Sequence, residues 1–184
     1  MADTETDPTG DARASRRGMS IFRGGDAPNL FESGTMSTPV WDAGDQAVVR
    51  ADGPRNPDVL IGGRDSVLYR GDGPDGWSMV RVWFGPHYVL PRHSHDSDCL
   101  YYVAEGSLTM GAQVLEPGDG FFLPAGAPYG YEAGPDGVVV IEFRTRTSFG
   151  MDIPGGQVER LRRAQAAADE HGDTWRALRA AGRD

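Results

Sequence analysis

The sequence predicts an all-β domain of antiparallel strands, preceded by an extended arm and followed by a short helical tail. From residue 46 onward, short runs rich in β-branched and aromatic residues alternate with segments rich in Gly, Pro and Asp. The first kind of segment is typical of strands and the second of tight turns. Because no long helical period separates the runs, we expect an antiparallel sandwich or barrel.

Eight runs carry the strand signal inside a single domain that we place at residues 46–150. They are residues 46–51, 66–70, 77–85, 99–106, 107–111, 113–118, 120–126 and 137–145. The turn sequences GDGPDG, EPGDG, PAGAP and AGPDG separate several of them. A chain of 184 residues is long enough for one core of this size plus two tails.

The N-terminal part of the chain has too few apolar side chains to form a core of its own. Residues 1–20 are polar, and we expect a disordered tail there. In residues 21–45, Gly and Pro separate four apolar anchors, which are Phe22, Leu30, Phe31 and Trp41. We expect an extended arm that lays these side chains on the body or on a partner subunit.

Residues 151–184 carry a helical pattern. A modest stripe at helical spacing is formed by Val158, Leu161, Gln165 and Ala168. We expect Gly172 to end this helix and Asp173 to cap a second short helix. The predicted helical extension either packs on the barrel, exchanges with a neighbouring subunit, or stays solvated.

Composition excludes several classes of function. The net charge of −9 argues against a general nucleic-acid binder and against binding to anionic membrane surfaces. The 18 basic residues include no lysine, which excludes Schiff-base catalysis and a phosphate-binding Walker lysine. The chain has one cysteine, no apolar signal segment, and no stretch near the roughly 20 apolar residues that span a bilayer. The expected location is therefore the cytoplasm.

Two histidines and the only cysteine lie close together in the segment HSHDSDC at 93–99. Side chains two apart on a strand point to the same face, so His93 and His95 direct two imidazoles into one space. Cys99 shares that face if the strand continues after the polar turn. Neutral imidazole is a common ligand of Fe, Mn, Co, Ni, Cu and Zn, so the segment is a candidate metal site. The alternative is a pair of surface histidines beside acidic residues.

This stretch resembles the two sequence motifs of the cupin family. The first motif is Gly, a spacer, His-x-His, three or four residues, Glu, six residues and Gly. The corresponding positions here, after a spacer two residues longer, are Gly85, His93, His95, Cys99 and Gly106. The second motif is Gly, five residues, Pro-x-Gly, two residues and His, and GDGFFLPAGAPY at 118–129 matches all but the last residue.

The resemblance implies a single jelly-roll barrel whose interior binds a metal through His93 and His95. Cys99 stands where the family has Glu, and Tyr129 stands where it has the final His. A thiolate favours Zn, Cu or Fe, and a phenolate can bind Fe(III) or Cu(II). Both residues are therefore candidate ligands, and both are candidate catalytic groups.

The remaining ligand positions stay open. Cys99 can instead be a small apolar residue of the barrel wall, and His87 on the preceding strand can then complete a three-histidine site. Asp98 and Glu142 are weaker carboxylate candidates. A metal-free pocket is a further alternative, and so is a nucleophilic Cys99 beside His95.

Inward-facing aromatic side chains of the predicted strands would form an apolar pocket around the metal. Three arginines are candidates to bind a substrate carboxylate, or else pair with acidic groups at the surface: Arg81, Arg92 and Arg144.

The predicted function is that of a metal-dependent enzyme acting on a small organic metabolite, with an oxygenase as the first choice. The expected cofactor is a divalent transition metal, whether Fe, Zn, Cu, Ni or Mn. The alternatives are a metal-dependent isomerase, cyclase or lyase, and a non-catalytic small-molecule sensor. Proteins that this chain resembles commonly form homodimers through exposed strands and exchanged arms, so we expect a homodimer without nucleic-acid or membrane partners.

Overall fold

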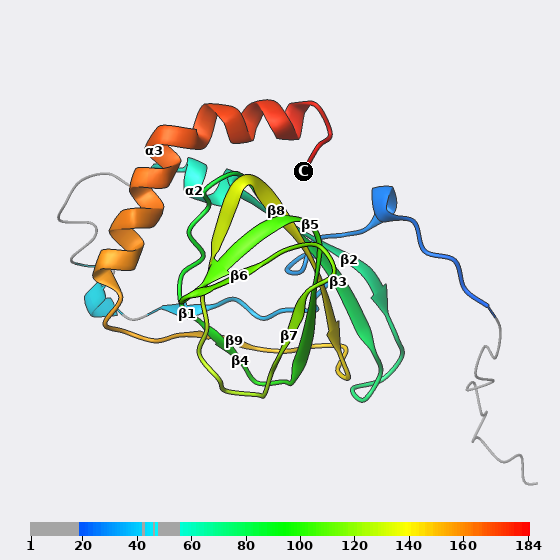
Figure 1. Cartoon of the computed structure of the whole chain (residues 1–184). Coiled ribbons are helices and arrows are strands. Elements are labelled where there is room, and N and C mark those ends of the chain that lie inside the picture. The colour runs from blue at the N-terminus through cyan, green and yellow to red at the C-terminus, as the bar shows by residue number, and fades with distance from the viewer. Residues whose placement is uncertain (1–18, 42, 46, 48–55) are drawn as a thin grey trace, which may run out of the picture.

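The computed structural model describes residues 19–41, 43–45, 47 and 56–184, and its strands form two sheets (Figure 1). The larger sheet contains β2 (Gly63–Arg70), β3 (Ser78–Phe84), β8 (Glu132–Arg144), β5 (Cys99–Met110), β6 (Gln113–Leu115) and β7 (Gly120–Leu123). Its order is β2-β3-β8-β5-β6, and β7 also pairs with β5. The smaller sheet has the order β1-β9-β4 and contains β1 (Val40–Trp41), β9 (Met151–Ile153) and β4 (Ser94–His95).

The predicted all-β class with a C-terminal helix is confirmed. All strand pairs of the larger sheet are antiparallel, and β1 and β9 form a parallel pair in the smaller one. The described strands form two hydrogen-bonded sheets rather than one continuous closed barrel, and this arrangement fits a jelly roll. The strand predicted at 46–51 falls, except for Ala47, outside the described residues.

The main core lies on the inner face of the larger sheet. Alternate residues of a strand face the same way, and the inward positions of the central strands are filled by Val80, Val82, Val140 and Val103. All four are buried and belong to one apolar cluster. Valine suits this position because its branched side chain packs well on a pleated surface.

β5 is one continuous strand where the sequence predicted two. The predicted break falls at Gly106, which has a φ of +67° and lies where the pairing with β8 shifts register. A Cβ at this position would lie 2.1 Å from the carbonyl oxygen of Gly137. Gly106 therefore permits a bulge within the strand and does not end it. β8 likewise continues through the AGPDG sequence that was predicted to be a turn.

The N-terminal arm follows the free edge of β2. It contains the 3₁₀ turn η1 (Gly24–Asp26) and then donates and accepts hydrogen bonds with the strand. The Val67 amide donates to the Pro28 carbonyl at 2.8 Å, and the Leu30 amide donates to Asp65 Oδ1 at 2.6 Å. The Leu30 side chain is buried in the main apolar cluster, whereas Phe22 is exposed. Residues 1–18, where we predicted disorder, lie outside the described part.

The C-terminal extension, predicted to be helical from residue 151, begins with β9 and then forms a single helix, α3 (Val158–Ala180), so the predicted stop at Gly172 is wrong. The reason is a close approach to the short helix α2 (Asp58–Ile61). A Cβ at Gly172 would lie 2.4 Å from Asp58 Oδ2, so glycine at this position lets the two helices meet. Glycine is unfavourable inside a helix in isolation, but tertiary packing overrides that preference here.

α3 covers part of the outer face of the larger sheet (Figure 1). Trp175 is fully buried and donates its indole N–H to the Pro86 carbonyl at 2.9 Å. It packs in a second apolar cluster with Trp83 of β3 and Val139 of β8. Among the described residues, no helix combines the length and the apolar character needed to cross a bilayer.

Candidate metal centre

Two short pairings hold the HSH segment. His93 and Tyr129 exchange both backbone hydrogen bonds at 2.9 Å, and His95 in β4 pairs with Met151 of β9. The rings of His93 and His95 come together, with centroids 4.9 Å apart. The alternation expected from the sequence therefore places the two imidazoles side by side, with His93 buried.

The hydrogen bonds fix the tautomer of both imidazoles. His93 Nδ1 lies 2.9 Å from the Pro91 carbonyl oxygen, and His95 Nδ1 lies 2.9 Å from the Gly150 carbonyl oxygen. A carbonyl oxygen can only accept, so each Nδ1 carries the proton. Each neutral ring then keeps a lone pair on Nε2. The same arrangement orients metal-binding histidines, whose second nitrogen usually donates to a carbonyl or carboxylate.

The hydroxyl of Tyr129 lies in front of both lone pairs. Its oxygen is 2.9 Å from His93 Nε2 and 3.5 Å from His95 Nε2. The hydroxyl has one proton and donates it to the nearer nitrogen, so the lone pair of His95 Nε2 receives no proton from Tyr129. Two imidazoles and one phenol thus converge on a single point.

A buried chain of donors continues behind Tyr129. Tyr101 lies 2.8 Å away, hydroxyl to hydroxyl, and Arg144 Nη2 donates to the Tyr101 oxygen at 3.2 Å. Because a guanidinium only donates and Tyr129 directs its proton to His93, Tyr101 must donate to Tyr129. The chain therefore has one direction, from the Arg144 cation through two phenols to an imidazole.

Arg144 is held by an ion pair inside the domain. Its Nη1 donates to Glu142 Oε2 at 2.6 Å, and its guanidinium lies 4.0 Å from the ring centroid of Phe149. Although burial disfavours the charge, Glu142 raises the pKa of Arg144 above its ordinary value. Arg144 Nε is buried without a hydrogen-bond partner among the described residues. The pair places a permanent cation next to Tyr101.

Burial keeps the acid–base groups of the site neutral. It lowers the pKa of His93 from 6.5 to about 4, and the neighbouring His95 lowers it further. Burial, and next Arg144, also lower the pKa of His95. Burial and the charge of Glu142 raise the pKa of Tyr129 well above 10. At neutral pH the imidazoles therefore present lone pairs, and Tyr129 keeps its proton.

Cys99 lies in the wall beside the site and is buried. Its Sγ is 3.7 Å from the Leu100 carbonyl oxygen, and it belongs to the main apolar cluster. Burial, together with Glu142, raises the pKa of its thiol to about 12. The described residues contain no group of three His, Cys, Asp or Glu side chains placed to hold a metal, so the thiol does not complete a cluster with the two histidines.

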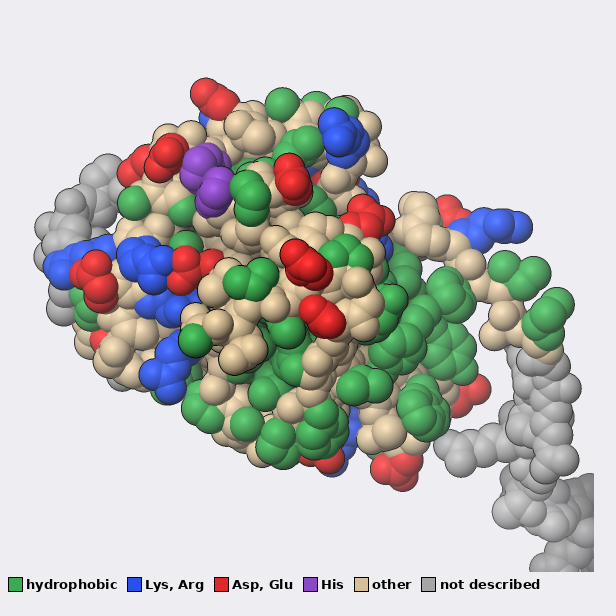
Figure 2. Space-filling view, in the orientation of Figure 1, with side chains coloured by type: hydrophobic (Ala, Val, Ile, Leu, Met, Phe, Trp, Pro, Cys, Tyr) green, Lys and Arg blue, Asp and Glu red, His purple; other side chains and the backbone are tan. Residues whose placement is uncertain are grey.

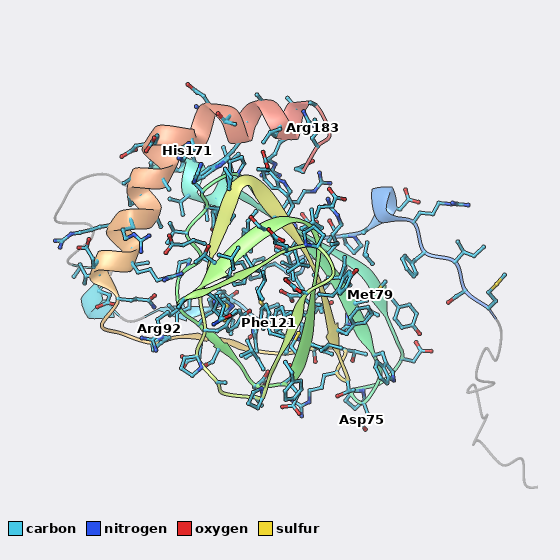
Figure 3. The ribbon with its side chains drawn as sticks, in the orientation of Figure 1. Asp75, Met79, Arg92, Phe121, His171 and Arg183 are labelled. Carbon is cyan, nitrogen blue, oxygen red and sulfur yellow. The ribbon has the colours of Figure 1, made fainter. Side chains whose placement is uncertain are left out.

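His87 is not brought to the imidazole pair. It lies at the surface, with a φ of +60°, and stacks on His171 of α3 with ring centroids 4.6 Å apart. Figure 3 labels His171 on that helix. Asp98 is also exposed, and its carboxylate accepts the Ala125 amide.

The three predicted arginines separate in the structure. Arg92 is exposed (Figure 3), and Arg81 donates to the main-chain oxygen of Asp184 at 3.0 Å. Only Arg144 adjoins the imidazole pair, through Tyr101. Sequence reasoning did not single out Tyr101 as a site residue, although its parity with Cys99 on β5 was a signal that it faces inward. Phe121 stacks on it, with ring centroids 4.5 Å apart.

No family model matches the chain, and no curated protein matches it. Solved structures similar to it include KdgF from a Halomonas species (25% identity, 51% of this chain and 86% of that chain, TM-score 0.40). An RmlC-like cupin from Shewanella frigidimarina (26% identity, 45% and 75%, TM-score 0.39) is also similar. The polyketide cyclase RemF from Streptomyces resistomycificus is a third (25% identity, 45% and 64%, TM-score 0.39). The second of these is described as a cupin, and it is the motifs at residues 85–106 and 118–129 that resemble those of the cupin family.

The residues present fit the transition metal that this resemblance implies. Both Nδ1 atoms donate to backbone carbonyls, so both Nε2 atoms are free of protons and directed at one point. Imidazole suits Zn, Cu, Fe and Ni, and a phenol at that point offers an oxygen donor. The backbone carbonyls of Pro91 and Gly150 hold the rings in place without occupying these donors.

Proposed function

We propose that this protein is a metal-dependent enzyme that acts on a small organic molecule inside the jelly roll. The cation would be held by His93, His95 and Tyr129, and an oxygenase is the first reaction to test. One observation carries the proposal: two imidazoles with fixed tautomers direct their Nε2 lone pairs at the same phenol oxygen.

The residues around this point have distinct tasks. A bound metal with open positions supplies Lewis-acid activation of a substrate oxygen or of O₂. Tyr129 holds a proton at its hydroxyl oxygen and accepts one from Tyr101, so it can donate to or accept from a bound substrate. Phe149 lies edge-on to the His95 ring and Phe121 lies beside Tyr129, so both give the site apolar walls. Arg144 stabilises negative charge that develops on either phenol.

Elemental analysis of purified protein tests the metal ligands. The wild type is compared with His93→Ala, His95→Ala, Tyr129→Phe and Cys99→Ala. We expect the first two to lose metal almost completely, and Tyr129→Phe to weaken binding about 10-fold or more. Cys99→Ala, a matched substitution in the neighbouring wall, should retain it. Retention of metal in both histidine variants would overturn the proposal. O₂ uptake by the metal-loaded wild type on candidate substrates then tests the oxygenase reaction.

A second candidate is a metal-independent isomerase, cyclase or lyase that works by proton transfer. The directed chain from Arg144 through Tyr101 to Tyr129 favours it, because the Tyr101 hydroxyl can replace a proton that Tyr129 gives up, and the Arg144 cation stabilises the phenolate then left on Tyr101. Solvent deuterium exchange into a panel of small keto acids and hydroxy ketones, followed by NMR, tests this chemistry. Exchange that survives a chelator but is lost in Tyr129→Phe would favour the second candidate, and exchange that needs the metal would favour the first.

A further inference from the structure

Charged and apolar residues form a row across the outer face of the larger sheet. Each member lies opposite the next in the strand pairing, and in order they are Arg64 of β2, Trp83 of β3, Val139 of β8 and Glu105 of β5. Opposite residues on paired strands share a face of the sheet. The row therefore has a cation at one end, an apolar middle and an anion at the other end.

The residues that follow α3 cover this row and enclose a pocket. Gly182 has a φ of +65° and turns residues 181–184 back towards the sheet (Figure 1). The pocket has a volume of about 450 Å³, which lies in the range of sites for small metabolites. Trp83 and Val139 form its apolar floor, and Leu178 of α3 forms an apolar wall.

The pocket carries opposite charges at its two ends. Arg81 of β3 lines it near Arg64, and Glu105 and Asp136 line it from β5 and β8. Among the described residues, these two carboxylates have no basic partner. Figure 2 shows acidic and basic side chains on the surface in this region, which Figure 3 locates by its label on Arg183.

The basic end of the pocket holds the carboxylate of Asp184. Its Oδ2 accepts a hydrogen bond from Arg64 Nη1 at 2.8 Å and lies 3.3 Å from Arg179 Nε. The main-chain oxygen of Asp184 accepts from Arg81 Nη1 at 3.0 Å. The Asp184 side chain is only 2% exposed. Although burial acts in the opposite direction, Arg64 lowers the pKa of Asp184, so the group bound by the arginines is an anion.

The contacts of Asp184 indicate the chemistry that this pocket recognises. Its carboxylate and its main-chain oxygen are separated by Cα and Cβ, and a free acidic amino acid has the same arrangement. Guanidinium groups suit the carboxylates of such a molecule. Its ammonium group is complementary to Glu105 and Asp136, whereas a plain dicarboxylate would be repelled by them.

We propose that this pocket is a second ligand site, which binds a free acidic amino acid when Asp184 leaves the arginines. The carboxylates of the ligand take the place of Asp184, and its ammonium group faces Glu105 and Asp136. Because Asp184 belongs to the same chain, it competes at a high effective concentration and weakens binding to the wild type. The site lies on the outer face of the sheet, so the proposal does not rest on the metal or on the proposed reaction.

Isothermal titration calorimetry of the chelator-treated full chain with L-aspartate tests the site. We expect Asp184→Ala to bind about 10-fold more tightly than the wild type, because the internal competitor is gone. Adding Arg81→Gln to this variant should weaken binding by about 10-fold or more, because a charged hydrogen-bond donor is lost. Adding Arg146→Gln is the matched control. Arg146 pairs with Asp96 and does not line the pocket, so this change should leave binding as it is.

A second probe tests the charge pattern of the pocket. Succinate has the two carboxylates of aspartate without the ammonium group, so it should bind more weakly, and Glu105→Gln should narrow the difference. Asp184→Asn repeats the opening of the site in case Asp184→Ala fails to fold, and far-UV circular dichroism checks each variant. The proposal is overturned by a lack of binding to both Asp184 variants, by binding that Arg81→Gln leaves unchanged, or by equal affinity for the two probes.

Discussion

The buried imidazole of His93 should make the fold sensitive to acid. In the metal-free protein, burial lowers the pKa of His93 from 6.5 to about 4, and that shift disfavours the native state when the ring takes up a proton. Between these two values the unfolded chain binds more protons than the folded one. The stabilisation is therefore present in full above about pH 6.5 and is lost as the pH falls towards 4.

The size of the effect follows from the shift. A pKa difference of about 2.5 units corresponds to roughly 3 kcal/mol of unfolding free energy when the transition is complete. At pH 6 His93 should account for a loss of less than about 1 kcal/mol, and at pH 4.5 for a loss of about 2.5 kcal/mol. His95 adds a loss in the same direction, because burial lowers its pKa too.

Urea unfolding followed by tryptophan fluorescence measures this loss. Chelator-treated wild type and His93→Gln are compared at about pH 8, 6 and 4.5. Glutamine removes the titrating ring, so the variant should lose about 2.5 kcal/mol less than the wild type between the extremes. An NMR titration of the His93 ring checks the assignment directly. If the two proteins lose the same free energy, or if the ring titrates near 6.5, the reasoning from burial is wrong.

Three further predictions concern stability and reactivity. Glu142→Gln leaves the buried Arg144 cation unpaired, so we expect the free energy of unfolding in urea to fall by about 3–5 kcal/mol. Adding Arg144→Met should restore most of that free energy. A double variant that shows no recovery would contradict a paired charge. Gly172→Ala should destabilise the protein by about 1–3 kcal/mol despite the helix propensity of alanine, because its Cβ meets Asp58; an unchanged melting temperature would argue against the close approach of the two helices. Cys99 should react with a disulfide reagent only as fast as the protein unfolds, since it is buried and its pKa is raised to about 12; rapid labelling without urea would show that the thiol is accessible.

The sequence was sufficient to predict the larger sheet because most of its strands are strongly patterned. Valine and aromatic runs bounded by Gly and Pro mark β3, β7 and most of β5. The strands of the smaller sheet have two or three residues each, which is too short for any period to be visible. The predictions that Gly106 and Gly172 end their elements were wrong for one reason. Gly106 lies against the backbone of Gly137 and Gly172 lies against Asp58, and both neighbours are far away in the sequence.

Only the part of the candidate site that depends on neighbouring residues in the sequence could be predicted. The pair His93 and His95 follows from the two-residue period of a strand. The link from Arg144 through Tyr101 to Tyr129 joins side chains on β8, β5 and the loop after β7, so their meeting depends on strand order and register. His87 was misplaced because a left-handed residue after Pro86 turns its ring towards α3, and no sequence pattern indicated that turn.

The strict alternation along β5 has a practical consequence for mutagenesis. The side chains of Cys99, Tyr101 and Val103 are buried, and those of Leu100 and Tyr102 are exposed. In a library that randomises residues 99–103, neighbouring positions will therefore be under different constraints. Substitutions at the odd-numbered positions will be limited by packing and by the site inside the protein. Substitutions at the even-numbered positions will be limited by contacts at the protein surface.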